Sequence, residues 1–317
     1  MEHPAAVFLI PALAVVLDRL LGDPVNWPHP VRLIGKGLDL FETAVRRTGV
    51  NLRLAGWGAV LLFAWAAWFV VAELTSIRYL GPLLAVYFAY AGLALGCLLK
   101  DARRVAELLD SGDLNGARTA LSMLVSRETA GLDAPDIRRT LAETVSENLN
   151  DGFTAPLFYL ALLGPGGLWA YKAVSTMDSM WGYRTDRYID LGQGAARTDD
   201  VLAWIPARLT AFFLFIVGKR LGLKAATARG RYREDARKME SPNAGYPMAA
   251  AAWLLEGRMG GPTVYFGKVK DKPMLGPEGT WWDGVKLHKL FRLAGKTGTL
   301  AACVLIPVLG LIRLLFA

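Results

Sequence analysis

The sequence predicts an all-α protein, a polytopic integral membrane helical bundle with broken or re-entrant helices. Of its 317 residues, 53% are hydrophobic, and the mean hydropathy is positive. Several apolar runs approach the roughly 20 residues that a helix needs to cross a bilayer. Trp and Tyr residues cluster around these runs, as interfacial anchors do. Buried helices of a large soluble protein are the alternative, and they would not explain that clustering.

Six apolar runs account for the predicted helices in the membrane. The strongest are 55–74, 80–99 and 297–316. Three weaker runs, which carry charges or Gly and Pro breaks, are 5–21, 153–171 and 201–217. The first of the weaker runs lacks a basic leader, so we expect a retained helix rather than a cleaved signal peptide.

The fifth and sixth runs leave two topologies open. Gly164 to Gly167 break the fifth run, while Pro206 and Arg208 interrupt the sixth. If both cross fully, the polar segment 172–200 lies outside the cell; if both are re-entrant, it stays inside. Broken helices at membrane depth are tolerated where they line an enclosed or wet cavity. We favour the re-entrant arrangement.

Loop charges indicate the orientation of a single membrane-embedded domain covering 1–317. Segment 218–296 has sixteen Lys and Arg against seven Asp and Glu, and 22–53 has five against three. The positive-inside rule places both on the cytoplasmic side, and 100–152 follows them as amphipathic helices. The net charge of +8 suits contact with anionic lipid. No basic stretch is interleaved with exposed aromatics, so nucleic acid is not an expected partner.

Several standard chemical motifs are absent from the sequence. There is no P-loop, no H-E-x-x-H and no G-x-S-x-G. Cys97 and Cys303 both fall within predicted spans, which argues against a disulfide framework. The chain has three His in total, so a zinc site is not expected.

A first polar constellation occupies SENLNDGFTAP, residues 146–156. Glu143, Glu147 and Asp151 stand at i, i+4 and i+8, so a regular helix would place all three on one face. A solvated acidic face is the ordinary explanation. The neighbouring Asn148 and Asn150, at a membrane boundary, favour a functional site equally.

The end of the same stretch predicts a helix start. Thr154 can cap the following helix, with Pro156 in its first turn. The exposed N–H groups of such a start would favour a phosphate or carboxylate.

A second constellation covers residues 172–210, where basic and acidic side chains alternate. Hard cations such as magnesium choose carboxylate oxygens, and arginine suits phosphate and carboxylate groups. Structural salt bridges are the better explanation for any single pair. For the whole segment we favour function, especially at Arg208, because an ionisable group inside a span normally has a partner or a task.

A third constellation, SPNAGYPMAAAAWLLEG at 241–257, combines turn residues with an Ala-rich helix. A plain turn is one interpretation, and a polar substrate held by Asn243 and Tyr246 is the other.

Four blocks, 22–35, 143–159, 172–211 and 241–252, resemble the adenosylcobinamide-phosphate synthase family of cobalamin biosynthesis. They occur in the family order, whereas the match is loose in 36–100, 105–125 and after about 267. The sequence also departs from the family at Arg127-Glu128-Thr129, where the family has Asp in the middle position.

The resemblance implies ATP-dependent amide ligation, with magnesium, at the cell (inner) membrane. The family joins aminopropanol or its O-phosphate to a propionate of adenosylcobyric acid, so cobalt enters only within the corrinoid substrate. An acyl phosphate would supply a good leaving group, and a carboxylate would take the proton from the amine. The expected partners are these substrates and the bilayer, with room for contact with other membrane enzymes of cobalamin assembly. The site is expected to face the cytoplasm.

The same resemblance, combined with the side-chain chemistry, assigns roles to individual residues. Catalytic roles are expected for Glu147, Asp151, Lys172, Arg184, Asp186 and Arg187. Substrate binding is expected for Asn148, Asn150, Arg197, Arg208, Asn243 and His29, and magnesium ligation for Asp190, Asp199 and Asp200. Asp18, Arg19 and Asp23 have family-like surroundings, while His29 could equally be a turn residue bonded to backbone.

Two other classes of function remain open at this point. A transporter or non-catalytic binding protein would also place charges and broken helices at membrane depth. A membrane transferase acting on lipid-linked phosphates would use acidic clusters with magnesium, although in other spacings.

Overall fold

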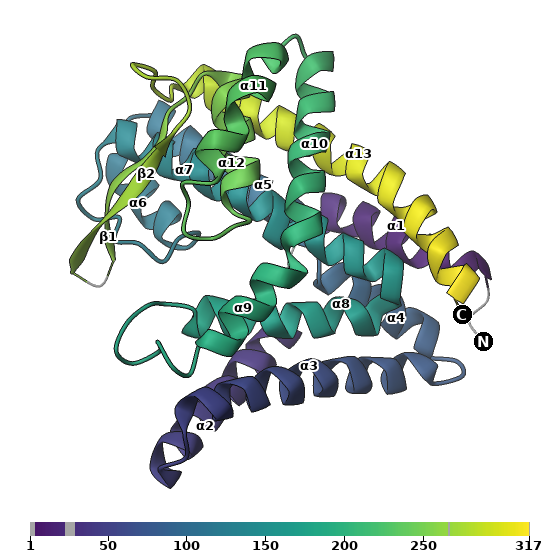
Figure 1. The fold of residues 1–317 in the computed structure, drawn as a ribbon. Helices are drawn as coiled ribbons and strands as arrows, with labels where there is room; N and C mark the ends of the chain where they lie inside the picture. The colour runs from purple at the N-terminus through teal and green to yellow at the C-terminus, as the bar shows by residue number, and fades with distance from the viewer. Residues whose placement is uncertain (1–3, 23–28, 266, 317) are drawn as a thin grey trace. The chain divides into compact units, whose positions relative to one another are not determined.

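Long apolar helices dominate the computed structural model of the chain, which describes residues 4–22, 29–265 and 267–316 (Figure 1). By length and composition, five helical stretches of the described chain could cross a membrane, and a helix pair broken at Ala203 would make six. The five are Pro4–Leu21, Leu52–Ser76, Gly81–Asp110, Ala134–Trp181 and Gly284–Phe316. The predicted all-α membrane bundle is confirmed.

Contacts along the chain divide it into two compact units. The first unit comprises Met1–Ala94, Ala155–Ala203 and Ala302–Ala317, and the second comprises Leu95–Thr154 and Trp204–Ala301. The expectation of a single embedded domain with cytoplasmic helical segments stays a prediction.

The first unit is a helical assembly with an aromatic and aliphatic core. Its elements are α1 (Pro4–Leu21), α2 (Pro30–Thr48), α3 (Leu52–Ser76), α4 (Gly81–Ala91), α8 (Ala155–Trp181), α9 (Gln193–Leu202) and the end of α13 (Gly284–Phe316). Leu38 of α2, Val60 of α3, Met177 and Trp181 of α8 and Ala195 of α9 meet in one buried cluster. Where such helices lie in a bilayer, close van der Waals packing of these side chains holds them together.

The second unit combines helices with one β-hairpin. Its elements are α5 (Leu95–Asp110), α6 (Leu114–Ser122), α7 (Ala134–Leu149), η1 (Asn150–Thr154), α10 (Trp204–Arg220), α11 (Ala225–Ala236), α12 (Gly245–Leu255), β1 (Met259–Tyr265), β2 (Lys268–Leu275) and most of α13. Helix α7 packs against α5, α6, α12 and β1. The expected helices of segment 100–152 are separated by breaks at Ser111–Asp113 and at 123–133, which contain Gly112 and Gly131.

The hairpin corrects the expectation that segment 218–296 is wholly helical. Strands β1 and β2 are antiparallel, and Val264 lies opposite Val269. The run Thr263-Val264-Tyr265 is rich in residues that favour strands. A bulge between Met259 and Gly261 interrupts the ladder, and both glycines at 260 and 261 adopt positive φ, of 94° and 91°.

The two predicted helix breaks have different outcomes. Helix α8 is broken at Gly164, which has φ 77° and ψ −171°, as the Gly-Pro-Gly-Gly run predicts. Only a residue without Cβ enters this region freely, and Pro165 can then begin the next helical segment. The other break lies at Ala203, between α9 and α10, so Pro206 and Arg208 do not interrupt α10. Pro206 falls in the first turn of α10, where a missing N–H costs nothing.

Candidate functional site

The predicted site residues fall into both units. The second unit contains Glu147, Asn148, Asn150, Asp151, Arg208 and Asn243. The first unit contains His29, Lys172, Arg184, Asp186, Arg187, Asp190, Arg197, Asp199 and Asp200.

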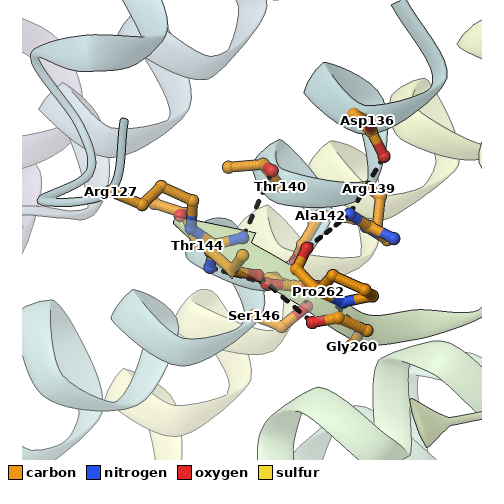
Figure 2. A network of polar contacts seen from close by, with 12 residues as sticks. Arg127, Asp136, Arg139, Thr140, Ala142, Thr144, Ser146, Gly260 and Pro262 are labelled. Atoms are coloured by element: carbon orange, nitrogen blue, oxygen red, sulfur yellow. Dashed lines mark hydrogen bonds and ion pairs between the residues drawn. The ribbon is translucent and has the colours of Figure 1, made fainter. Parts of the chain in front are cut away.

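A buried ion pair lies beside the second unit's acidic motif. Arg127 Nη2 donates to Glu143 Oε2 at 2.7 Å, and the two side chains are 5% and 1% exposed. Arg127 Nη1 donates to Thr140 Oγ1 at 3.2 Å, and Gly260 N donates to Glu143 Oε1 at 2.8 Å. Figure 2 shows Arg127 and Gly260 approaching helix α7 from separate segments of the chain. Glu143 therefore fastens strand β1 to α7, rather than forming part of a solvated acidic face.

Glu147 lies one turn further along α7, half-buried, in a field of both signs. The charges that act on it belong to Lys272, Glu143 and Arg127. The Lys272 ammonium is 5.5 Å from the centroid of the Tyr265 ring, and the Arg127 guanidinium is 6.0 Å from the same centroid. Glu147 is thus a carboxylate with cationic neighbours, which suits either a general base or a ligand-orienting group.

The chain continues from α7 into α8 through a π-helical turn, η1, without a helix end. This corrects the expectation that Thr154 caps a new helix. Thr154 Oγ1 instead donates to Leu149 O, five residues earlier, at 3.0 Å. Without a helix start, the N–H groups there are not exposed to an anion. The placement of Glu143, Glu147 and Asp151 on one face stays a prediction.

Asparagine side chains hold the π-turn in place. Asn150 is 1% exposed, and its Nδ2 donates to Asp151 Oδ1 at 2.7 Å. Its Oδ1 accepts a 3.0 Å bond from Thr210 Oγ1 of α10. Asn148 Nδ2 donates to Thr144 O at 3.0 Å. These contacts are intramolecular, and the substrate-binding roles of Asn148 and Asn150 stay predictions.

Arg208 has the partners that its position in an apolar helix requires. Its guanidinium carbon lies 4.1 Å from the centroid of the Trp204 ring and 4.2 Å from that of the Tyr246 ring. Its Nη1 donates to Asn243 Oδ1 at 3.1 Å. The second and third sequence motifs therefore meet inside the second unit. This contact links two residues, Arg208 and Asn243, for which substrate binding is predicted.

In the first unit, the loop after α8 is fastened to α2 through Glu42. Arg187 Nη2 and Arg46 Nε approach Glu42 Oε1 at 2.9 and 2.8 Å. Glu42 is 4% exposed. Burial alone would raise the pKa of Glu42, but hydrogen bonds from Arg46 and Arg187 outweigh it and lower that pKa below 4.5. Arg187 is thus engaged by a residue that the sequence motifs do not include.

The remaining charged residues of this loop and α9 are spread along the surface. Arg184, Asp186, Asp190 and Arg197 are exposed, whereas Lys172, Asp199 and Asp200 are half-buried. Asp190 pairs with Arg53 of α3 at 3.0 Å. In the described part of the chain, no three His, Cys, Asp or Glu side chains gather in a metal-binding arrangement. Magnesium ligation by Asp190, Asp199 and Asp200 stays a prediction, and it would need ligands from phosphates or water.

His29, in the sequence block 22–35, is the N-cap of helix α2. His29 precedes α2, and its Nδ1 accepts a 3.3 Å bond from Val31 N. This geometry is the turn histidine of the ordinary interpretation. Asp18, within α1, is 1% exposed. Asp23 lies outside the described residues.

Glu128, where the sequence departs from the family, has a structural role. Its Oε1 accepts a 2.7 Å bond from Gly267 N at the hairpin turn, and its own N–H donates to Val264 O at 3.0 Å. Sequence reasoning missed Glu42, Thr210 and Lys272, because each is brought to its partner by tertiary contact. No local spacing signals them.

Comparison with known proteins assigns the family. The CobD/Cbib protein family matches residues 11–294. The chain belongs to this family. The Cobalamin biosynthesis protein CobD of Pelobacter propionicus is 40% identical over 310 residues, covering 95% of each chain. That of Geobacter metallireducens is 41% identical over 284 residues, covering 86% of this chain and 88% of the relative. No solved structure matches the chain. The resemblance inferred from the four sequence blocks is confirmed, so this is a membrane protein of a cobalamin biosynthesis family.

Proposed function

We propose that the protein is an ATP-dependent amide ligase of cobalamin biosynthesis. It would join aminopropanol, or its O-phosphate, to a propionate carboxylate of adenosylcobyric acid, giving adenosylcobinamide or its phosphate. The observation that carries the proposal is a family match over residues 11–294, together with a relative named for cobalamin biosynthesis that covers 95% of the chain. These names favour a biosynthetic enzyme over a transporter or a lipid-phosphate transferase.

The chemistry explains why such a protein needs clustered charges. A propionate carboxylate resists attack by an amine, because it is anionic and its oxygen leaves poorly. Transfer of the terminal phosphate of ATP to the carboxylate oxygen would release ADP and create an acyl phosphate. The amine nitrogen would then attack the carbonyl carbon, phosphate would leave, and a base would take the amine proton. Charge stabilisation and positioning do most of the work in phosphoryl transfer.

The residues of the second unit supply a base with suitable neighbours. Glu147 lies in the field of Lys272, of the Glu143 carboxylate and of Arg127, so it can accept a proton close to two groups that attract anions. Asp151, oriented by the Asn150 amide at 2.7 Å, is the second candidate. Arg208 is already positioned between two aromatic rings, and a planar fork held in this way can bind a carboxylate or phosphate without being ordered first.

The residues of the first unit fit magnesium only as partial ligands. Asp199 and Asp200 are adjacent, half-buried carboxylates on α9. Magnesium is ordinarily held by one or two carboxylates with substrate phosphates and water. Neighbouring side chains on a helix point in different directions, so one carboxylate of this pair would supply the protein's share. When bound, the ion would neutralise charge on ATP. Lys172, Arg184 and Arg197 are the candidates for holding phosphate or propionate groups.

A coupling assay tests the proposal directly. Membranes containing the protein would receive adenosylcobyric acid, ATP, magnesium and either amine donor, and the corrinoid product would be weighed by mass spectrometry. We expect a mass gain that corresponds to one amide bond and depends on ATP. No gain with either donor, from protein shown to be folded, would overturn the ligase function.

Matched variants test the assigned residues. Asp151→Asn and Arg184→Ala should abolish coupling while the protein stays in the membrane. Asp271→Asn and Arg47→Ala remove the same charges at exposed positions of the hairpin and of α2, and both should leave coupling unchanged. Normal turnover in the first two variants would remove these residues from the proposed site. For orientation, a cysteine placed near Gly194, at the exposed Ile189, should resist an impermeant thiol reagent in intact cells if segment 172–200 faces the cytoplasm.

A further inference from the structure

The charged helix α2 joins α1 and α3, two helices that are long and apolar enough to cross the membrane. Residues 22–29 separate α1 from α2, and residues 49–51 separate α2 from α3. Helix α2 carries four basic and two acidic residues among its 19, so it is too polar to cross. Two consecutive spans joined by a segment that does not cross have their facing ends on the same side of the membrane. Helix α2 is therefore confined to one membrane surface.

One face of α2 packs against α3 near the start of that span. The Phe41 ring lies 5.9 Å from the Phe63 ring, measured between centroids, and Leu38 is buried in the same cluster. Trp57, in the second turn of α3, is 40% exposed, as tryptophans at a membrane–water interface commonly are. Phe63 follows Trp57 by less than two helical turns. The middle of α2 therefore lies close to the membrane boundary.

The opposite face of α2 is exposed and mixes leucines with cations. Leu33, Lys36, Leu40 and Arg47 stand at i, i+3, i+7 and i+14, a spacing that places them on one stripe of the helix. We call it the outer stripe. Leu33 is 66% exposed and Leu40 is 73% exposed, and the side chains of Lys36 and Arg47 are exposed as well. The stripe is thus both apolar and basic.

The exposed side of α2 has an excess of positive charge. Glu42 is buried and already bound by two arginines, so Asp39 is the one carboxylate that α2 exposes. Three exposed cations, Arg32, Lys36 and Arg47, outnumber it. Basic side chains next to a membrane are attracted to the negative surface potential of anionic lipids. The charge of α2 therefore complements such a surface.

We propose that the outer stripe of α2 lies in the headgroup layer of the membrane and binds anionic lipid. Leu33 and Leu40 enter the boundary of the acyl chains, as the apolar side of an interfacial helix does. The alkyl stems of Lys36 and Arg47 lie along the same boundary, while their charged ends reach the lipid phosphates. The bilayer is the occupant because α2 is tied to its surface at both ends, through α1 and α3. This role does not depend on amide ligation.

A fluorescent label on the outer stripe tests where the stripe lies. In the full-length protein with Cys97 and Cys303 replaced by Ala, the environment-sensitive dye NBD would be attached to Leu40→Cys. Asp271→Cys, at an exposed position of the hairpin, would carry the same dye as a control. The proteins would be reconstituted in phosphatidylcholine vesicles with or without phosphatidylglycerol, and circular dichroism would verify that each is folded.

The label at position 40 should emit at shorter wavelength and lose most of its fluorescence when the lipids carry bromine on their acyl chains. Leu33→Cys, a second position of the stripe, should give the same result. The label at position 271 should show neither change.

Charge variants test the preference for anionic lipid. Phosphatidylglycerol should increase the quenching at position 40, and the combined changes Lys36→Gln and Arg47→Gln should remove that increase. The matched pair Arg229→Gln and Arg231→Gln removes two exposed arginines of α11 and should preserve it.

Three results would overturn the proposal. Emission and quenching at positions 33 and 40 that match those at position 271 would place the outer stripe in water. Emission at shorter wavelength without quenching by brominated lipids would show that protein covers the stripe instead. Quenching that neither phosphatidylglycerol nor the Lys36 and Arg47 changes alter would refute the binding of anionic lipid.

Discussion

Replacing Arg127 with Met should destabilise the second unit, because it removes one partner of a buried ion pair. The side chains of Arg127 and Glu143 are 5% and 1% exposed, and their charged atoms are 2.7 Å apart. After the substitution, Glu143 keeps its bond from Gly260 N, but its charge has lost its counter-ion. Breaking a buried pair in this way typically costs about 3–5 kcal/mol.

The cost should appear as a lower melting temperature. For a domain of 150–250 residues, 1 kcal/mol corresponds to about 2–4 °C, so the expected fall is about 6–20 °C. Circular dichroism of the protein in nanodiscs would measure it at pH 7. Arg104→Met removes an exposed arginine from α5 in the same unit, and it should shift the melting temperature by no more than about 2 °C, as an ordinary surface change does.

A double variant separates the charge effect from lost packing. In Arg127→Met with Glu143→Gln, no charge is buried, while the amide oxygen of Gln can still accept from Gly260 N. The double variant should therefore melt above the single variant. If the single variant melts like the parent protein, or if the double variant is as unstable as the sum of the two single changes, the pair does not act as described.

Three further predictions concern the other polar and backbone features. Gly164→Ala should lower the melting temperature by several degrees, because φ of Gly164 is 77° and the added Cβ would come within 2.4 Å of the Arg313 guanidinium. In the control Gly58→Ala, the added Cβ meets no other atom within 4 Å, so this variant should be tolerated. Glu42→Gln should have a lower free energy of unfolding than the parent protein at pH 7. Because the pKa of Glu42 is lowered in the folded state, this difference in free energy should shrink as the pH falls below 4.5. A difference that does not depend on pH would contradict this. Arg208→Lys should reduce coupling despite keeping the charge, because Lys cannot form the planar stack between two rings, and full activity would show that the stack is dispensable.

The helical architecture could be predicted because an apolar run of spanning length indicates a helix in lipid, whatever residues lie elsewhere in the chain. The run 55–74 became α3, and the Gly164 break was recognisable because Gly-Pro forces a helix to end. The hairpin at 259–275 could not be anticipated in the same way. Its strands are short, and part of their stability comes from contacts with Glu143 and Glu128, residues more than 100 positions away in the sequence.

The sequence predicts which polar side chains belong to the site better than it predicts which residues they contact. Arg208 was expected to have a partner because an unpaired charge in an apolar helix is costly. That its partners are Asn243 and Tyr246 depends on the packing of α10 against α12. Spacing along the sequence does not encode that contact. The same reasoning explains why Glu42, in a block with little family resemblance, was not associated with Arg187.

The acidic stretch around Asp151 shows how one proline can change the geometry of a motif. Pro156 has no N–H to offer to the carbonyl of Gly152, and in a regular α-helix its ring would collide with that carbonyl. The π-turn at Asn150–Thr154 immediately precedes this position and widens the helix. The wider turn relieves the collision, and the helix continues. The wider turn leaves backbone carbonyls that need hydrogen-bond donors, and Thr154 Oγ1 donates to Leu149 O. Such turns occur often at functional sites. Asp151 therefore owes its direction to the π-turn and to Asn150, and Pro156→Ala should reorient it by allowing the turn to relax towards a regular helix.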